Sequence, residues 1–229
     1  MPEAGTGDLY DELRRQNRER ASQHAMLLKQ QDVTSEIQLV DALYSDPERV
    51  AAHRAHYADL AVVAGALGDT KEGDIALRYF GALLLESGRP VLVVPPRWNT
   101  ALPPKRVVLA WRPTAESARA LHDALPLLQA ADEVDVLVVD AVAGETRHGE
   151  QPGSDIAAHL ARHGVTTHVV ERKSGARSVA AILLERAYER HADLIVAGGY
   201  GHSRVREWAM GGVTRELLFT APIPVFYSH

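Results

Sequence analysis

Residues 198–214 form the segment of the chain whose residue types are best suited to binding an anion. The segment reads GGYGHSRVREWAMGGVT, with glycines toward both ends and basic and hydroxyl side chains among and between them. Gly198, Gly201 and Gly211 permit positive φ angles and let a ligand come close to the main chain. Where a helix begins at Gly211–Val213, free N–H groups and the helix dipole favour a negative charge. The pattern predicts a phosphate-binding loop; the alternative is a glycine-rich loop that only turns the chain.

Side chains of the same segment add groups that bind phosphate. Arg204 supplies positive charge, and the hydroxyls of Ser203 and Thr214 can donate hydrogen bonds. His202 is the histidine whose position suggests phosphate contact, with a structural polar role as its alternative. We include these four residues in the predicted phosphate site.

Patterns for catalysis or metal binding are weaker in the rest of the chain. The absence of cysteine excludes disulfides, thiol nucleophiles and cysteine-ligated metals. His159 and His163 are one helical turn apart, but no carboxylate completes an HExxH pattern. Asp140, Glu145 and Asp155 could supply an acid and a base, but nothing in the sequence fixes their geometry. Neither a GxSxG nor a Walker lysine motif occurs. We predict no metal site and no catalytic residue.

Composition and charge exclude several classes of protein. The 229 residues carry 25 basic and 30 acidic side chains, and the net charge of −5 gives no broad basic surface for nucleic acid. The longest apolar runs, such as residues 60–67, are too short to cross a membrane. Residues 1–5 lack the basic start and apolar core of a signal peptide. The sequence predicts a cytoplasmic protein with no nucleic-acid or membrane partner.

The elements that must position the glycine segment are strands that alternate with helices over residues 105–229. Continuous apolar strands joined by helices indicate an α/β fold, a parallel sheet with helices on both faces. The glycine segment follows the fourth strand and opens the last helix, which is where such sheets bind ligands. The expected strands are 106–111, 134–139, 165–170, 193–197 and 224–227, and the expected helices are 115–129, 154–163, 178–188 and 212–220.

An internal repeat with an offset of 134 residues relates the start of the chain to its end. Residues 58–63 (ADLAVV) match residues 192–197 (ADLIVA), and residues 90–94 match residues 224–228. An offset of this size suits a small α/β domain and is too long for a solenoid unit. The predicted domains are 1–96, truncated and degenerate; 97–104, a proline-rich linker; and 105–229, complete.

The first copy is incomplete and has lost the glycines. Everything equivalent to the first strand and first helix of the second copy would precede Met1. At the offset of 134, Gly201 and Gly211 are replaced by Leu67 and Leu77, which block close approach to the main chain. We therefore expect one pocket per chain. The elements expected before residue 97 are helices at 8–29, 47–57 and 74–87 and strands at 35–40, 60–64 and 91–94.

The spacing Gly198-x2-Gly201-x9-Gly211, after the strand at 193–197, resembles the nucleotide motif of the universal stress protein family. The resemblance implies a five-stranded, flavodoxin- or Rossmann-like domain of three layers, often in tandem. It also implies a bound adenine nucleotide (ATP, ADP or AMP), with or without Mg²⁺. The predicted phosphate contacts are Gly198, Gly201, His202, Ser203, Arg204, Gly211, Gly212, Val213 and Thr214, and the contacts that the resemblance implies for adenosine are Ala110, Trp111, Arg112 and Val139.

The sequence departs from the family pattern at two places. Nucleotide-binding members usually have an acidic residue and Gly-Ser where Arg112 and Pro113-Thr114 stand, and Ser or Thr where Gly212 stands. Main-chain N–H groups do most of the phosphate binding, so a missing hydroxyl weakens such a site without abolishing it. We predict a regulatory or stress-response protein that binds an adenine nucleotide in residues 105–229. The alternatives are a nucleotide-independent interaction module of the same fold and a slow ATPase.

The resemblance also implies how strands and chains associate. In the family's sheet the first strand lies between the second and the fourth, and domains commonly pair through their last strands, here 91–94 with 225–227. The truncation of the first copy leaves the edges of strands 35–40 and 60–64 exposed. We predict a homodimer in which the amino-terminal halves meet and the helix at 8–29 covers the gap. The alternatives are direct pairing of the remaining strands and a natural gene start upstream of Met1.

Overall fold

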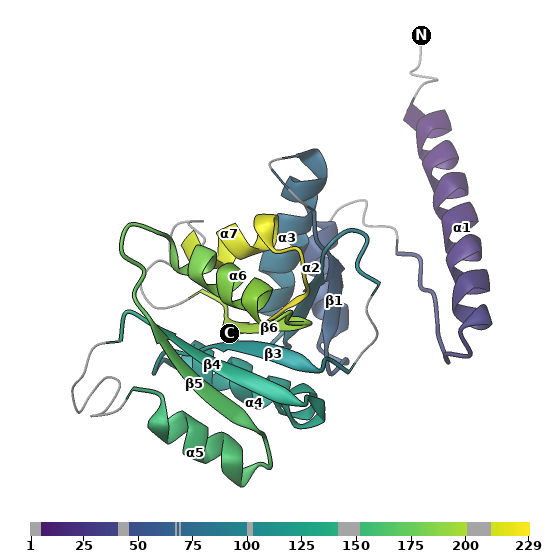
Figure 1. Cartoon of the computed structure of the whole chain (residues 1–229). Helices are drawn as coiled ribbons and strands as arrows, with labels where there is room; N and C mark the ends of the chain where they lie inside the picture. The colour runs from purple at the N-terminus through teal and green to yellow at the C-terminus, as the bar shows by residue number, and fades with distance from the viewer. Residues whose placement is uncertain are drawn as a thin grey trace. The chain divides into compact units, whose positions relative to one another are not determined.

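The chain contains two compact units, residues 1–45 and residues 46–229. The first unit holds α1 (Thr6–Gln30), and residues 33–40 after it form neither helix nor strand. All the described strands belong to the second unit. The computed structural model describes residues 6–40, 46–66, 68, 70–99, 103–141, 152–200 and 212–229 (Figure 1).

The second unit is built on a seven-stranded sheet with the order β1-β2-β7-β6-β3-β4-β5. The five strands β7-β6-β3-β4-β5 are mutually parallel, with β3 between β4 and β6 as the resemblance implied. The sheet has seven strands because β2 pairs antiparallel with β7 and β1 pairs parallel with β2. The strands are β1 (Ala61–Ala64), β2 (Val91–Val94), β3 (Arg106–Ala110), β4 (Glu133–Val139), β5 (Thr167–Arg172), β6 (Leu194–Gly198) and β7 (Val225–Ser228).

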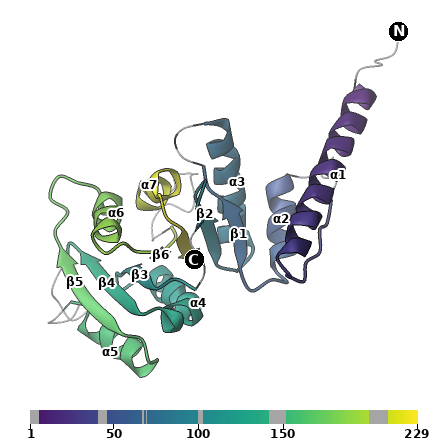
Figure 2. The ribbon, with the colours of Figure 1, turned by 45° about the vertical axis from the view of Figure 1, so that its right-hand side comes forward.

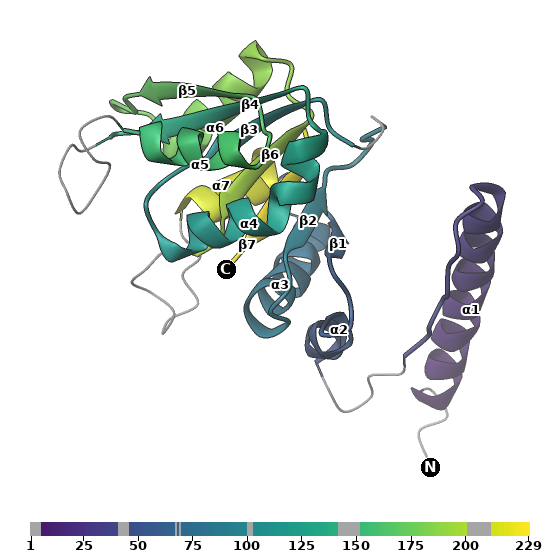
Figure 3. The same cartoon turned by 90° about the horizontal axis from the view of Figure 1, so that it is seen from below.

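Helices cover both faces of this sheet and complete a three-layer α/β fold. Neighbouring residues of a strand point to opposite faces, so Leu109 packs with α4 and α5 while Val108 packs with α6 and α7. Figure 3 shows α4 and α5 on the same side of the sheet. The helices of this unit are α2 (Pro47–Ala55), α3 (Lys71–Glu86), α4 (Ala115–Ala130), α5 (Ser154–Arg162), α6 (Val179–Glu189) and α7 (Gly212–Thr220).

Hydroxyl side chains fix where three of these helices begin. Thr70, Thr114 and Ser178 precede α3, α4 and α6, and each accepts a hydrogen bond from the N–H three residues further on. This geometry satisfies one of the N–H groups that the first turn of a helix leaves without a partner. Except for one strand, the predicted helices and strands all occur, with ends shifted by at most three residues.

The exception is the strand predicted at residues 35–40. These residues are exposed and without β pairing. Their counterparts at the offset of 134 residues begin within β5, which pairs with β4. No strand in the described part of the chain pairs with residues 35–40 as β4 pairs with β5. The prediction was wrong because an apolar alternation forms a strand only beside a partner.

Two strand–helix–strand units, β1-α3-β2 and β6-α7-β7, lie within residues 46–229 and pair their strands in the same register. Ala61 lies opposite Val91, and 134 residues later Ile195 lies opposite Val225. The two units meet where β2 and β7 run antiparallel, with Val91 opposite Tyr227, so the predicted pairing of the last strands is confirmed. Figure 2 shows α3 alongside β1 and β2.

Candidate functional site

The carboxyl ends of β3, β4 and β6 lie side by side along the edge of the sheet where the parallel strands end, which is distinct from its outer strands β1 and β5. From β3 the chain continues to β4 and β5 on one side and returns to β6 on the other, so the strand order reverses between β3 and β6. Parallel sheets bind ligands in the crevice at such a reversal. Ala110 ends β3, Val139 ends β4 and Gly198 ends β6, so three predicted site residues lie at the same edge.

Two further residues predicted to contact adenosine follow β3. Trp111 is half-buried, and its main-chain N–H donates to the carbonyl oxygen of Leu137 (3.0 Å). This bond extends the pairing of β3 with β4. Arg112 is exposed. Its guanidinium therefore brings a positive charge to the edge of the sheet, where the family pattern has a negative one.

The structure describes both ends of the predicted phosphate loop, residues 198–200, which we call the loop stem, and residues 212–214. Gly212 and Val213 open α7. N–H groups of a first helical turn have no partner within the helix, so they are available to an anion. The predicted contacts that lie outside the described residues are Gly201, His202, Ser203, Arg204 and Gly211.

Gly198 allows β6 to pack closely against α4. A Cβ at Gly198 would lie 2.8 Å from the carbonyl carbon of Glu116 and from the nitrogen of Ser117, both in the first turn of α4. Its φ is outside the left-handed region, so the sequence argument from positive φ is wrong at this position. The close packing brings the N-terminus of α4 to the end of β6, and α7 begins beyond the same loop.

Gly199 is held by residues far away in the sequence. Its N–H donates to the carbonyl oxygen of Ser228 (2.8 Å), and its own carbonyl oxygen lies 3.0 Å from Nδ1 of His229. A Cβ at Gly199 would lie 2.5 Å from Cδ2 of Leu84 in α3. The candidate site therefore includes contacts from α3, far before residue 105 in the sequence, which the sequence reasoning missed. One signal was present: the counterpart of Gly199 in the repeat is also a glycine, Gly65.

Tyr200 is the last residue of the loop stem and has a φ of 53°. Its N–H donates to Oγ1 of Thr214 (3.5 Å), which links the two ends of the predicted loop. Its ring stacks on Phe80 of α3, with 6.3 Å between centroids, and meets the imidazole of His229 edge-on. Burial raises the pKa of the Tyr200 hydroxyl to about 12, so the side chain stays neutral at physiological pH.

Thr214 and Gly212, both in the first turn of α7, differ in how closely they are packed. Thr214 is buried, and its hydroxyl oxygen accepts a hydrogen bond from the N–H of Tyr200. A Cβ at Gly212 would meet no atom of the described residues within 4 Å. Packing within the described part of the chain therefore does not require glycine at the position where the family pattern has Ser or Thr.

Asp140 follows β4 at the same edge and has a φ of 54°. Its carboxylate accepts hydrogen bonds from the N–H of Ser174 (2.9 Å) and from the hydroxyl of Ser174 (2.6 Å). These bonds hold the pKa of Asp140 below its ordinary value, which keeps the group ionised. The side chain fixes the loop after β5, and this use of its oxygens disfavours a role as general base.

Three histidines form a cluster away from this edge, between α4 and α5. The ring of His159 lies 5.2 Å from that of His122 and 4.7 Å from that of His163. Burial and the neighbouring charges, with His163 first among them, lower the pKa of His159. No group of three or more histidine, aspartate or glutamate side chains in the described part of the chain could hold a metal ion. None of the described helices is long and apolar enough to span a membrane.

Comparisons with known proteins agree with this architecture. A sequence model described as "Universal stress protein family" matches residues 106–228. The structure is similar to that of a universal stress protein from Archaeoglobus fulgidus DSM 4304, with a TM-score of 0.73 and 16% identity over 100% of this chain and 83% of that one. A universal stress family protein from Burkholderia pseudomallei matches at 24% identity and a TM-score of 0.41, over 56% of this chain and 98% of its own. No curated protein matches.

Proposed function

Because the chain belongs to the universal stress protein family, we propose that it binds one adenine nucleotide (ATP, ADP or AMP), with or without Mg²⁺, as a cytoplasmic stress-response regulator. The observation that carries this proposal is the reversal of strand order between β3 and β6. The ends of these strands, the N-terminus of α4 and the loop that leads to α7 gather there. Such an edge is where parallel sheets hold phosphorylated ligands.

The chemistry of the described residues supports positions for the phosphates and for the adenine ring. The phosphates would accept hydrogen bonds from the first turn of α7 at Gly212 and Val213 and would pair with the exposed Arg112. The half-buried Trp111 and Val139 supply the apolar surface that an adenine ring needs.

The use of Asp140 supports a regulatory ligand over a hydrolysed substrate. Both oxygens of this carboxylate accept from Ser174, so the side chain is held against the loop after β5. A general base must lie within hydrogen-bonding reach of the proton that it removes. We infer that the nucleotide biases the conformation of the protein or its choice of partner.

Calorimetric titration with ATP, ADP and AMP, each with and without Mg²⁺, tests the proposal. We expect one site per chain for at least one of these nucleotides at near-millimolar concentration. Gly201→Leu, which introduces the residue found at the counterpart position 67, should abolish binding because the side chain blocks the main chain. The matched variant Leu67→Gly should leave binding unchanged. The absence of heat with all three nucleotides would overturn the proposal.

We also propose that β1-α3-β2 is the remnant of a second universal stress domain and that its open side meets a second copy of the chain. Among the described strands β1 pairs with β2 alone, and Val62 is 62% exposed. The N–H groups of Ala61 and Gly65 donate to β2, so those of Val62 and Ala64 point to the open edge. An apolar edge of this kind favours pairing with another chain.

Light scattering at micromolar concentration tests this assembly. We expect about twice the chain mass for the full chain, and a monomer for Val62→Lys because a buried lysine would oppose the pairing. Val169→Lys is the matched control, because Val169 is 39% exposed on β5, the other edge strand of the sheet. It should leave the dimer intact. A monodisperse monomer for the full chain would contradict the proposal, and deletion of residues 1–30 would show whether the long helix contributes.

A further inference from the structure

The loop stem is held between two helices that come from different copies of the repeat. On one side, Gly198 touches the main chain of α4, which belongs to residues 105–229. On the other side, Gly199 touches Leu84 of α3, which belongs to the amino-terminal copy. Leu84 is 3% exposed, so it has little room to move away from the stem.

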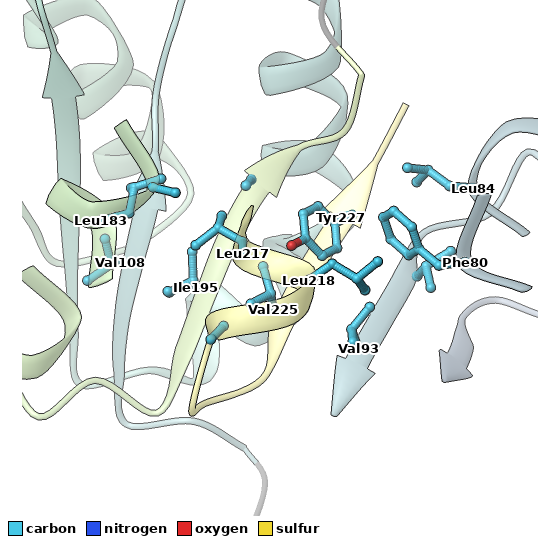
Figure 4. Close-up of a cluster of buried hydrophobic side chains, with 14 of the residues drawn as sticks. Phe80, Leu84, Val93, Val108, Leu183, Ile195, Leu217, Leu218, Val225 and Tyr227 are labelled. Atoms are coloured by element: carbon cyan, nitrogen blue, oxygen red, sulfur yellow. The ribbon is translucent and has the colours of Figure 1, made fainter. Parts of the chain in front are cut away.

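The third stem residue rests on the same helix. Phe80 is fully buried, and its ring contacts both Tyr200, at 6.3 Å between centroids, and Tyr227 of β7, at 4.9 Å. Figure 4 shows Phe80 beside Tyr227, with Leu84 further along α3. The hydroxyl of Tyr200 lies 3.5 Å from where a Cβ on Gly81 would be. α3 thus packs against the side chain of Tyr200 along its length.

These contacts oppose an unfavourable backbone conformation. A tyrosine with a φ of 53° is in the left-handed region, which costs roughly 1–2 kcal/mol for a residue with a side chain. Such a conformation persists only where the surrounding packing determines it. The ring of Phe80 and the imidazole of His229 provide that packing. The N–H of Tyr200, held in this orientation, then reaches Thr214 at the start of α7.

We propose that Phe80 and Leu84 of the amino-terminal copy are positioning residues for the nucleotide site of the carboxy-terminal copy. This inference rests on the proposed nucleotide binding and names the elements that regulate it. The amino-terminal copy has lost its own glycines, but its helix α3 holds the stem of the remaining loop in the conformation that receives phosphate. A change at the open side of β1-α3-β2, such as association with a partner, would therefore alter nucleotide affinity.

Paired substitutions at positions 199 and 84 test the contact directly. Gly199→Ala should weaken ATP binding roughly tenfold, because the new Cβ displaces the stem from Leu84. Leu84→Ala in the same chain should restore affinity, because it removes the atom that the Cβ meets. Gly198→Ala is the matched control: its Cβ meets main-chain atoms of α4, so Leu84→Ala should not rescue it.

A second measurement does not depend on the nucleotide. Phe80→Leu should speed hydrogen exchange at the amides of Gly199 and Tyr200, which donate to Ser228 and Thr214, by a larger factor than in β3, where exchange reports only the global loss of stability. Leu183→Ala, in the same apolar cluster but on α6, should lower stability without changing either exchange in the stem or ATP affinity.

The outcomes distinguish the two proposals. If the wild-type chain gives no heat with any nucleotide, the proposed function fails and this inference fails with it. If the wild-type chain binds ATP, but Gly199→Ala and Phe80→Leu bind it equally well, the positioning role alone is overturned. Loss of affinity in Gly199→Ala that Leu84→Ala does not restore would also overturn it.

Discussion

The units β1-α3-β2 and β6-α7-β7 have the same strand register and different surroundings. Val62 and Val196 occupy the same position in the two units, yet Val62 is 62% exposed and Val196 is fully buried. β6 has β3 as its second neighbour and α4 on its face, whereas β1 has no second neighbour among the described strands. The comparison shows that pairing of two short apolar strands fixes register, while burial depends on elements that only one unit has.

The two units also differ where each strand leads into its helix. Gly198 ends β6, while the corresponding end of β1 is Ala64. Thr70 accepts a hydrogen bond from the N–H of Gly73 and caps α3, which begins at Lys71. The β1-α3-β2 unit thus has the strand register of β6-α7-β7 but not the glycine that lets β6 pack closely against α4.

The largest effect on stability that we predict is at Asp135 in β4, a strand that has no counterpart among the described residues before residue 105. Its side chain is 3% exposed on β4 and pairs with Arg186 (2.8 Å) and Arg190 (3.1 Å) of α6. Asp135→Ala leaves these cations without the shared carboxylate and should lower the free energy of unfolding by about 3–5 kcal/mol. Urea unfolding measures this.

Glu189→Ala is the control for Asp135, because its pair with Arg186 is much more exposed on the Glu189 side. An exposed pair contributes ~0–1 kcal/mol, so this variant should be close to wild type. Equal losses for the two variants would show that the difference between the copies does not lie in this ion pair.

The next effect sharpens the comparison of Val62 with Val196. Val196→Ala should cost about 2–3 kcal/mol, because it removes two buried methyl groups and leaves a cavity. Val62→Ala should cost less than about 0.5 kcal/mol in the monomer, as exposed substitutions do. Thermal unfolding at several protein concentrations measures both. A cost for Val62→Ala that grows with protein concentration would indicate that association buries this side chain.

Much of this fold can be predicted from the sequence. Apolar strands alternate with helices from residue 105 onward, and this alternation determines element type and approximate ends because each element must bury one face. The same reasoning failed at residues 35–40, where an apolar pattern is present but no partner strand is described. Strand formation there depends on a partner strand elsewhere in the chain, and a local pattern does not show whether such a partner lies beside it.

The candidate site is less predictable because its contacts join distant segments. Glycine spacing predicts a phosphate loop, but a positive φ is the wrong reason for glycine at position 198, where close packing against α4 requires it. Nothing near Gly199 in the sequence indicates Leu84, and nothing near Tyr200 indicates Phe80. These contacts arise because β2 pairs with β7 and brings α3 to the loop stem.

The smallest effect we predict concerns Gly212, where the chain departs from the family pattern without a packing reason. A Cβ there meets no atom of the described residues within 4 Å, and the position opens α7. Gly212→Ser should therefore fit without strain and place a hydroxyl beside the N–H groups of the first turn. One added hydrogen bond to a charged phosphate is worth ~1.5 kcal/mol, so we expect ATP to bind roughly tenfold more tightly. Gly212→Ala separates the hydroxyl from the effect of removing a glycine, which stabilises the helix by itself. Calorimetry should show tighter binding for serine than for alanine, and equal affinities would mean that the phosphate does not lie at the start of α7.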